Sequence, residues 1–196
     1  ENNMDIGDKA NDNLRINGKE VGAKVIGEGG NLGVSQLGRI EFSIAGGRIN
    51  TDFIDNSAGV GCSDAEVNIK IALRAAMKSK KITLDERNIL LQKMTNNVAC
   101  KVLQTNIDQT LAITIFEKSH SFTLEMFSKL ITFLEKHHSL DRETEFLPSD
   151  EELYERHNNG DKLTRPELCV LLSYSKISVF NQIESTDFVN DKYLNK

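Results

Sequence analysis

Apolar residues recur every three or four positions through the last two-thirds of the chain, as they do on one face of an amphipathic helix. The clearest run comprises Phe122, Met126, Leu130, Phe133 and Leu134. Charged residues such as Glu125 and Lys129 fall on the other side of this run. Such runs predict helices near residues 64–79, 84–117, 122–137, 150–158 and 165–184.

Four of these helices begin with a capping box, in which a serine or threonine precedes a glutamate by three residues. The four pairs are Ser63 with Glu66, Thr83 with Glu86, Ser149 with Glu152, and Thr164 with Glu167. In each pair the hydroxyl can accept a hydrogen bond from the glutamate's amide, while the carboxylate accepts one from the cap residue's amide. The 84–117 helix is long, and we consider Asn96 with Asn97, or Thr105 with Asn106, as places for a break.

The first 62 residues differ in pattern, because they hold every glycine of the chain except Gly160. They are predicted to form turns joined by short strands at residues 23–26 and 49–54, with a short helix over 36–45 between them. The expected fold class is therefore mainly α, with a partial α/β region at the start. We place the boundary between the two regions after residue 62.

A glycine-rich turn follows the first predicted strand. Its glycines are Gly27, Gly29, Gly30 and Gly33. Glycine lets the backbone approach a ligand closely and exposes N–H groups that can hold a phosphate or an amide. The spacing is similar to the first turn of a dinucleotide fold, with Asp52 or Asp55 near the place of a ribose-binding acid. A plain strand-to-helix turn explains the same glycines equally well, and the spacing does not decide between the two.

The charge of the chain bears on which classes of binding partner are expected. The net charge is −5 and the basic residues are scattered, so neither nucleic acid nor an anionic membrane surface is expected as a partner. No apolar stretch approaches the length of a membrane span, and the start lacks the plan of a signal peptide, so a cytoplasmic protein is expected. The opening Glu1-Asn-Asn-Met4 is not typical of a natural start. We therefore expect the chain to begin inside a longer protein.

The cysteines and histidines predict neither a metal site nor a disulfide framework. The cysteines are Cys62, Cys100 and Cys169, which are odd in number and lack C-x-x-C spacing. The histidines are His120, His137, His138 and His157, each close to a predicted helix end. Reduced thiols and solvated histidines are the expected state.

Five longer segments carry a resemblance to a known family. In the first part of the chain they are Gly27-Glu-Gly-Gly-Asn31, Gly46-Gly-Arg-Ile-Asn-Thr-Asp52, Asp55-Asn-Ser-Ala-Gly-Val60 and Ser63-Asp-Ala-Glu-Val-Asn-Ile-Lys70. In the helical part the segment is Leu163-Thr-Arg-Pro-Glu-Leu-Cys-Val-Leu-Leu-Ser-Tyr-Ser-Lys-Ile177. Together they resemble the large, NAD-specific bacterial glutamate dehydrogenases, over residues 7–192. The resemblance implies that residues 1–62 are the end of an NAD-binding α/β domain and residues 63–196 a helical C-terminal domain.

The resemblance also implies roles for single residues. Gly29, Gly30 and Asn31 belong to a cofactor-binding loop, in which Asn31 would form a hydrogen bond near the nicotinamide end of NAD. Asn56 matches a segment of the smaller relatives that lies beside nicotinamide and substrate. Ser63 matches a serine that binds the substrate's side-chain carboxylate. From local pattern alone Ser63 is the cap of the next helix, and both roles can hold at once.

For the intact enzyme, the resemblance implies oxidation of L-glutamate by NAD and water to 2-oxoglutarate and ammonia, in a homo-oligomer. The family's catalytic lysine and aspartate, its phosphate-binding turn and its substrate domain would lie upstream. No catalytic residue is therefore assigned in this chain, and the isolated chain is expected to be inactive. Its partners would be the upstream part of the same enzyme, L-glutamate and 2-oxoglutarate. Two alternatives stay open: an inactive remnant, or a separate subunit that docks onto an upstream fragment of a split dehydrogenase.

Overall fold

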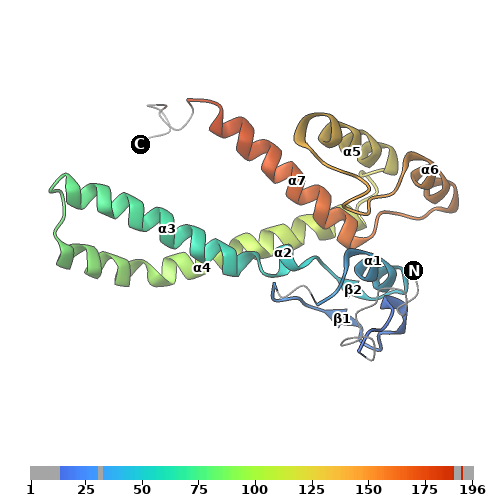
Figure 1. The fold of residues 1–196 in the computed structure, drawn as a ribbon, viewed down its shortest axis with the longest axis horizontal. Coiled ribbons are helices and arrows are strands. Elements are labelled where there is room, and N and C mark those ends of the chain that lie inside the picture. Colours follow the sequence, from blue (N-terminus) through green and yellow to red (C-terminus); the bar gives the residue numbers. More distant parts are fainter. Residues whose placement is uncertain (1–13, 31–32, 188–190, 192–196) are drawn as a thin grey trace. The chain divides into compact units, whose positions relative to one another are not determined.

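The computed structural model describes residues 14–30, 33–187 and 191, and this part of the chain is mainly helical, as predicted (Figure 1). The helices are α1 (Gln36–Ile44), α2 (Asp52–Asp55), α3 (Ser57–Lys78), α4 (Leu84–Lys118), α5 (Leu124–His138), α6 (Asp150–Asn159) and α7 (Arg165–Glu184). The other elements are the 3-10 turn η1 (Gly18–Glu20) and the strands β1 (Val25–Ile26) and β2 (Arg48–Ile49). The chain divides into unit 1, with residues 1–27, 33–51 and 113–196, and unit 2, with residues 28–32 and 52–112.

Unit 1 contains a small βαβ arrangement. Its strands β1 and β2 pair in parallel, with Ile26 opposite Ile49, and α1 forms the crossover between them. Phe42 on α1 is 2% exposed and lies over Gly47, where a Cβ would come within 2.3 Å of the aromatic ring. The backbone between α1 and β2 can therefore pass under this ring only because residue 47 has no side chain.

Three predicted capping boxes are confirmed, and they mark the starts of α4, α6 and α7. They are Thr83 with Glu86, Ser149 with Glu152, and Thr164 with Glu167. The amide of each cap donates to the carboxylate, at 2.7, 2.7 and 2.6 Å respectively. Each helix begins at the next residue, as the motif predicts.

The prediction of a fourth capping box, formed by Ser63 and Glu66, is wrong. Helix α3 begins at Ser57 with Asn56 at its N-cap position, so Ser63 lies in the second turn and is exposed. Glu66 does not reach back to Ser63 and pairs instead with Lys70, one turn further on. The earlier start is favoured by the amides of Gly59 and Val60, which donate to the carbonyl of Asn56 at 3.0 and 3.3 Å. The domain boundary expected after residue 62 stays a prediction.

Two further expectations are corrected. The strand predicted over 49–54 ends at Ile49, and residues 52–55 form the short helix α2 instead. Helix α4 is continuous through both places considered for a break. An apolar run as short as 49–54 has no measurable period, and asparagine in a helix is unfavourable without being forbidden.

The buried face of α5 also differs from the predicted one. Its buried residues are Leu124, Phe127, Ile131 and Leu134. Met126 and Phe133, which belong to the apolar run described above, are 50% and 45% exposed. The helix carries more apolar residues than one face can hold, so the spacing alone does not select which of them are buried.

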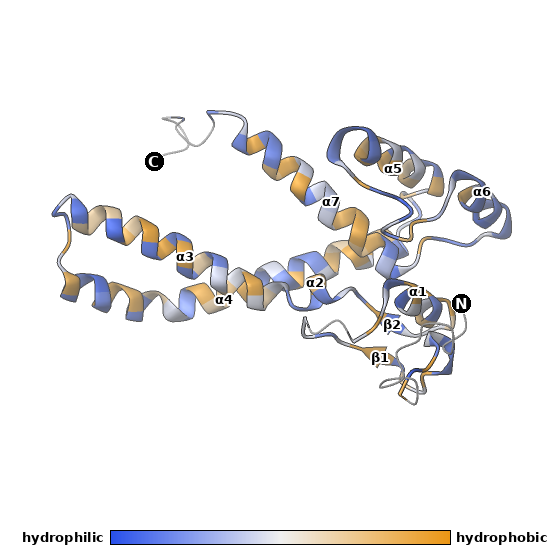
Figure 2. Ribbon diagram, viewed as in Figure 1, coloured by the Kyte–Doolittle hydropathy of each residue, from blue (hydrophilic) through white to orange (hydrophobic). Residues whose placement is uncertain are grey.

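The first part of α4 and the whole of α3 form a helical hairpin in unit 2, joined by residues 79–83 (Figure 1). The helices approach closely at Gly61, where a Cβ would lie 3.3 Å from Val102. Hydrophobic residues recur along both helices (Figure 2), and several of them are more than half exposed. They are Val60, Val67 and Ile71 on α3, and Leu84, Ile89, Leu103, Ile107 and Leu111 on α4. None of the helices that the structure describes is both long and apolar enough to cross a membrane.

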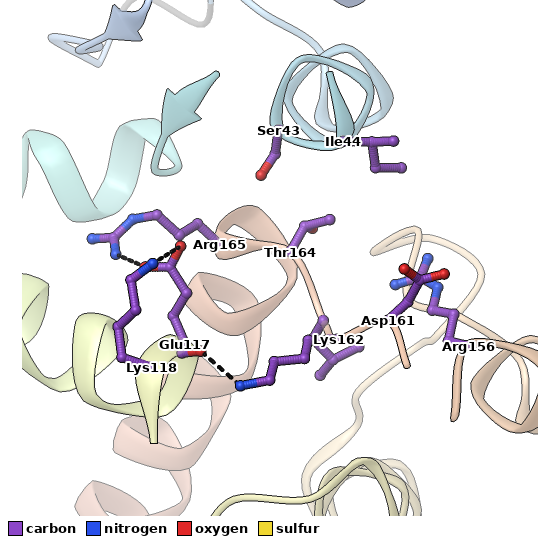
Figure 3. Close-up of a pocket in the computed structure, with 10 residues that line it drawn as sticks. Ser43, Ile44, Glu117, Lys118, Arg156, Asp161, Lys162, Thr164 and Arg165 are labelled. Atoms are coloured by element: carbon purple, nitrogen blue, oxygen red, sulfur yellow. Dashed lines mark hydrogen bonds and ion pairs between the residues drawn. The ribbon is translucent and has the colours of Figure 1, made fainter. Parts of the chain in front are cut away.

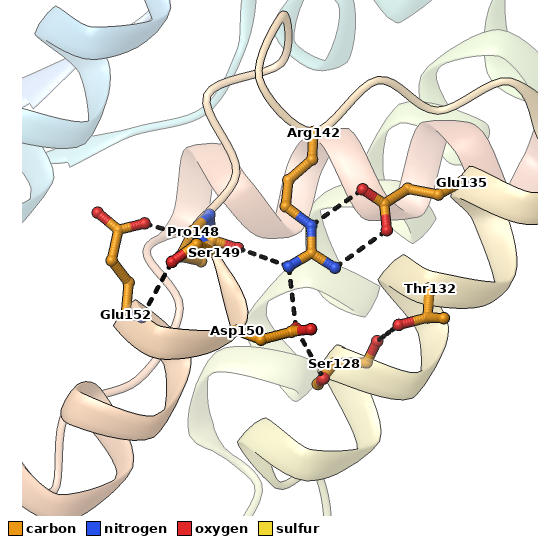
Figure 4. Close-up of polar contacts among 8 residues, drawn as sticks. All are labelled: Ser128, Thr132, Glu135, Arg142, Pro148, Ser149, Asp150 and Glu152. Atoms are coloured by element: carbon orange, nitrogen blue, oxygen red, sulfur yellow. Dashed lines mark hydrogen bonds and ion pairs between the residues drawn. The ribbon is translucent and has the colours of Figure 1, made fainter.

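Arg142 lies in the segment that connects α5 to α6 in unit 1, and its hydrogen bonds hold that segment against both helices (Figure 4). Its Nε and Nη2 donate to the two carboxylate oxygens of Glu135, each at 3.0 Å. Its Nη1 donates to Asp150 at 2.9 Å and to the carbonyl of Pro148 at 3.3 Å. Asp150 also accepts from the Ser128 hydroxyl at 3.3 Å, so one arginine links the end of α5, the connection and the start of α6.

Candidate functional site

The candidate site lies in unit 2, where the glycine-rich turn meets the start of α3. The backbone amide of Glu28 donates to the carboxylate of Asp55 at 3.0 Å. This bond joins two segments 27 residues apart in the sequence. The carboxylate of Asp55, considered above as a ribose-binding acid, thus holds the glycine-rich turn in place.

Gly30 brings the turn against the side chain of Asn56. It has φ +83, which is a left-handed conformation that favours glycine. A Cβ at this residue would lie 2.6 Å from Nδ2 of Asn56, far inside van der Waals contact. The backbone of Gly59 also lies close to this side chain, because a Cβ at residue 59 would be 2.8 Å from Oδ1 of Asn56. The carboxamide of Asn56 is therefore bracketed by two glycines.

The carboxamide of Asn56 has no hydrogen-bond partner within the described part of the chain. The residue occupies the N-cap position of α3, but its side chain makes no capping bond. It is half-buried, and its backbone amide donates to the carbonyl of Asp52 at 2.7 Å. The backbone is thus fixed while one donor and one acceptor of the side chain remain available to a ligand.

Asn106 supports this turn from α4, a role that the sequence reasoning above did not assign to it. Its Nδ2 donates to the carbonyl of Ile54 at 2.9 Å and to the hydroxyl of Ser57 at 2.8 Å. A third, longer contact of 3.4 Å reaches the carbonyl of Asp55. Thr105 with Asn106 is one of the two places considered above for a helix break, and α4 is continuous there. Its polar side chain in a helical run is the signal that could have indicated a buried partner.

The other residues predicted to bind cofactor or substrate are Gly29, Asn31 and Ser63. Gly29 is exposed and directly precedes Gly30. Asn31 lies outside the described residues. Ser63 is exposed on α3, seven residues after Asn56 and so on the same helical face, about 10 Å along the axis. The structure thus brings Gly30 and Asn56 together and places Ser63 along the helix that Asn56 begins.

The candidate site is built from groups that hydrogen-bond. In residues 14–30, 33–187 and 191, no three histidine, cysteine, aspartate or glutamate side chains gather where they could hold one ion. The functional groups at the candidate site are an amide side chain, a glycine backbone and a hydroxyl. These groups bind by hydrogen bonding and close approach.

Two family models match the chain. The model described as "Bacterial NAD-glutamate dehydrogenase, catalytic domain" matches residues 1–116. The model described as "Glutamate dehydrogenase, C-terminal" matches residues 160–196. The candidate site lies entirely within the first match.

Three curated proteins that are similar to the chain carry the name NAD-specific glutamate dehydrogenase. The protein from Pseudomonas aeruginosa is 49% identical over 196 residues, which is 100% of this chain and 12% of that protein. Those from Halomonas elongata and Mycobacterium tuberculosis are 46% and 44% identical, over 97% and 95% of this chain. In each case the chain spans 12% of the relative's length.

Proposed function

Since the chain belongs to the bacterial NAD-glutamate dehydrogenase family, we propose that it forms the nicotinamide-side wall of an NAD-dependent glutamate dehydrogenase. The enzyme's reaction converts L-glutamate, NAD and water to 2-oxoglutarate, ammonia and NADH. The observation that carries the proposal is the unpartnered carboxamide of Asn56, held beside the backbone of Gly30. NAD, when bound, supplies the hydride acceptor of this reaction.

The donor and acceptor of Asn56 match the chemistry of the nicotinamide group. Nicotinamide carries a carboxamide of its own, and two carboxamides can pair through one donor and one acceptor each. An amide that is half-buried and unpaired gains more from such a partner than one in open water. Asn56 therefore orients the nicotinamide ring, and it takes no part in proton transfer.

The glycine-rich turn fits the same role. Gly29 and Gly30 would approach the cofactor through their backbone, since a side chain at residue 30 would occupy the space beside Asn56. Asn31, which follows them in the sequence, would form the hydrogen bond near the nicotinamide end that the resemblance implies. The parallel pair of β1 and β2 with the crossover α1 is consistent with the end of an NAD-binding α/β domain. In such domains, ligands bind at the loops that follow the carboxyl ends of the strands.

Ser63 would bind the side-chain carboxylate of the substrate. Its hydroxyl is exposed and can donate one hydrogen bond to an anion. The distance of about 10 Å along α3 from Asn56 leaves room for the substrate between the nicotinamide and this hydroxyl. The lysine and aspartate that move protons would come from the upstream part of the enzyme, which is also the expected partner of this chain.

The test is Asn56→Ala in the full-length enzyme. Loss of a hydrogen-bonded pair with a half-buried ligand group predicts about tenfold weaker NADH binding, with smaller change in the affinity for glutamate. Asn96→Ala is the matched control, because Asn96 is an exposed asparagine on α4 with no assigned role. Equal NADH affinity in the Asn56 variant, the Asn96 variant and the wild type would refute the assignment.

A further inference from the structure

Unit 1 contains a cavity of about 520 Å³ (Figure 3). It lies where the C-terminal ends of α1, α4 and α6 meet the start of α7. Four basic residues line it (Figure 3): one from the end of α4, one from α6, one from the connection between α6 and α7, and one from the start of α7. They are Lys118, Arg156, Lys162 and Arg165.

Positive charge exceeds negative charge around this cavity. The lining carboxylates are Glu117 and Asp161, and Glu167 pairs with Arg156 at 3.0 Å from a buried position. Arg48 adds another cation 3.9 Å from the carboxylate of Glu117. Among the described residues, five cations thus share three carboxylates, which leaves two positive charges in excess. This local sign is opposite to the chain's net charge of −5.

Arg165 is the fixed part of the cluster. It is 7% exposed, its Nε donates to Asn50 at 3.0 Å, and its Nη1 donates to Thr114 and Glu117 at 3.1 and 2.9 Å. Its Nη2 has no acceptor in the described part of the chain. A guanidinium that is held rigidly and still has free donors is arranged to bind an anion through a planar fork.

The two lysines form the adjustable part. Lys162 is exposed and donates to the backbone carbonyl of Glu117 at 3.4 Å, which is a long bond. Lys118 is 67% exposed and lies 3.9 Å from the carboxylate of Glu117. Neither contact is strong, so both ammonium groups can turn toward a ligand in the cavity at little cost.

We propose that this cavity is a binding site for a phosphate-bearing small molecule, separate from the site at Asn56. The excess of two positive charges matches the charge of a phosphate group near neutral pH. The combination of one rigid guanidinium with two mobile ammonium groups suits a tetrahedral group with several oxygens better than a single flat carboxylate. The volume accommodates a ligand larger than phosphate alone.

The test is a calorimetric titration of the full-length protein with pyrophosphate, in the presence of saturating NADH so that the nicotinamide site is filled. The wild type should bind pyrophosphate, and added salt should weaken the binding. The double variant Lys118→Gln, Lys162→Gln should bind roughly tenfold more weakly, because two charges in direct reach of the anion are removed. The double variant Lys129→Gln, Lys136→Gln on α5 is the matched control and should bind like the wild type.

Three results would overturn the proposal. One is the absence of a binding isotherm with the wild type. Another is equal affinity in both double variants, which would place the anion elsewhere. The third is tighter binding of succinate than of pyrophosphate, which would exclude a preference for phosphate. The substituted lysines are all exposed, so the folded state should survive in each variant.

Discussion

Substituting Gly30 by alanine tests whether the geometry around Asn56 is needed for NAD binding. The new Cβ would lie 2.6 Å from Nδ2 and 3.2 Å from Cγ of Asn56. The left-handed φ of +83 adds a conformational cost of about 1 kcal/mol for any residue with a side chain. Relieving the overlap requires Asn56 to move, at a further cost of about 1 kcal/mol. The sum of about 2 kcal/mol corresponds to roughly 30-fold weaker NADH binding.

A second substitution separates the two costs. In the Asn56→Ala background the overlapping Nδ2 and Cγ are absent, and the remaining Cβ of Asn56 would be at an ordinary 3.6 Å. Gly30→Ala should then weaken NADH binding only about fivefold, from the conformational cost alone. Fluorescence titration with NADH of the full-length enzyme, in the wild type, both single variants and the double variant, measures this coupling.

Gly33→Ala is the control from the same turn. A Cβ at residue 33 would meet no atom within 4 Å, and its φ is not in the left-handed range. This variant should bind NADH like the wild type. The reasoning fails if the Gly30 and Gly33 variants behave alike, or if Gly30→Ala costs the same with and without the Asn56 side chain.

Three other outcomes are expected. Asn106→Ala should lower the melting temperature, since it leaves the Ile54 carbonyl without this donor at a cost of about 1–3 kcal/mol. The control is Thr105→Ala, which removes a hydrogen bond within α4 and should have a smaller effect in the same thermal scan. The hydrogen bond and charge of Arg142 lower the pKa of Asp150, so this pair stabilises the fold above the unfolded pKa of the carboxyl and stops doing so as the pH falls. Arg142→Met should therefore reduce the melting temperature near pH 7. The part of the deficit that comes from Asp150 should fade as the pH falls below about 4, the pKa of an unfolded aspartate; a deficit that stays constant with pH would contradict this account. The purified 196-residue chain should form no NADH from L-glutamate and NAD, because the proposed function places the catalytic lysine and aspartate upstream of it. Measurable glutamate-dependent absorbance at the NADH band would disprove this expectation.

Local signals predicted most of the helical framework. Helices such as α4 and α7 begin where a hydroxyl and a glutamate three residues apart cap each other, and that information is contained in four consecutive residues. The same motif was misleading at Ser63, because the glycine-containing segment before it is itself helical. Glycine lowers helix propensity by about 1 kcal/mol, which contacts such as that between Gly61 and Val102 can offset.

The candidate site was predicted only in part. Motif resemblance pointed to Gly30 and Asn56, but their close approach depends on a left-handed residue and on a bond between Glu28 and Asp55. The support from Asn106 joins segments about 50 residues apart, and no local pattern encodes such a pairing. The cation-lined cavity likewise gathers residues from distant segments, which appear in the sequence as scattered basic residues.

The positions of the three cysteines allow the α3–α4 hairpin to be labelled selectively for spectroscopy. Cys62 on α3 and Cys100 on α4 are exposed, whereas Cys169 on α7 is buried. A thiol-reactive spin label added to the folded chain should therefore modify one position on each helix of the hairpin and spare α7. Dipolar spectroscopy between the two labels would then record directly whether the helices separate or stay together when a partner is added.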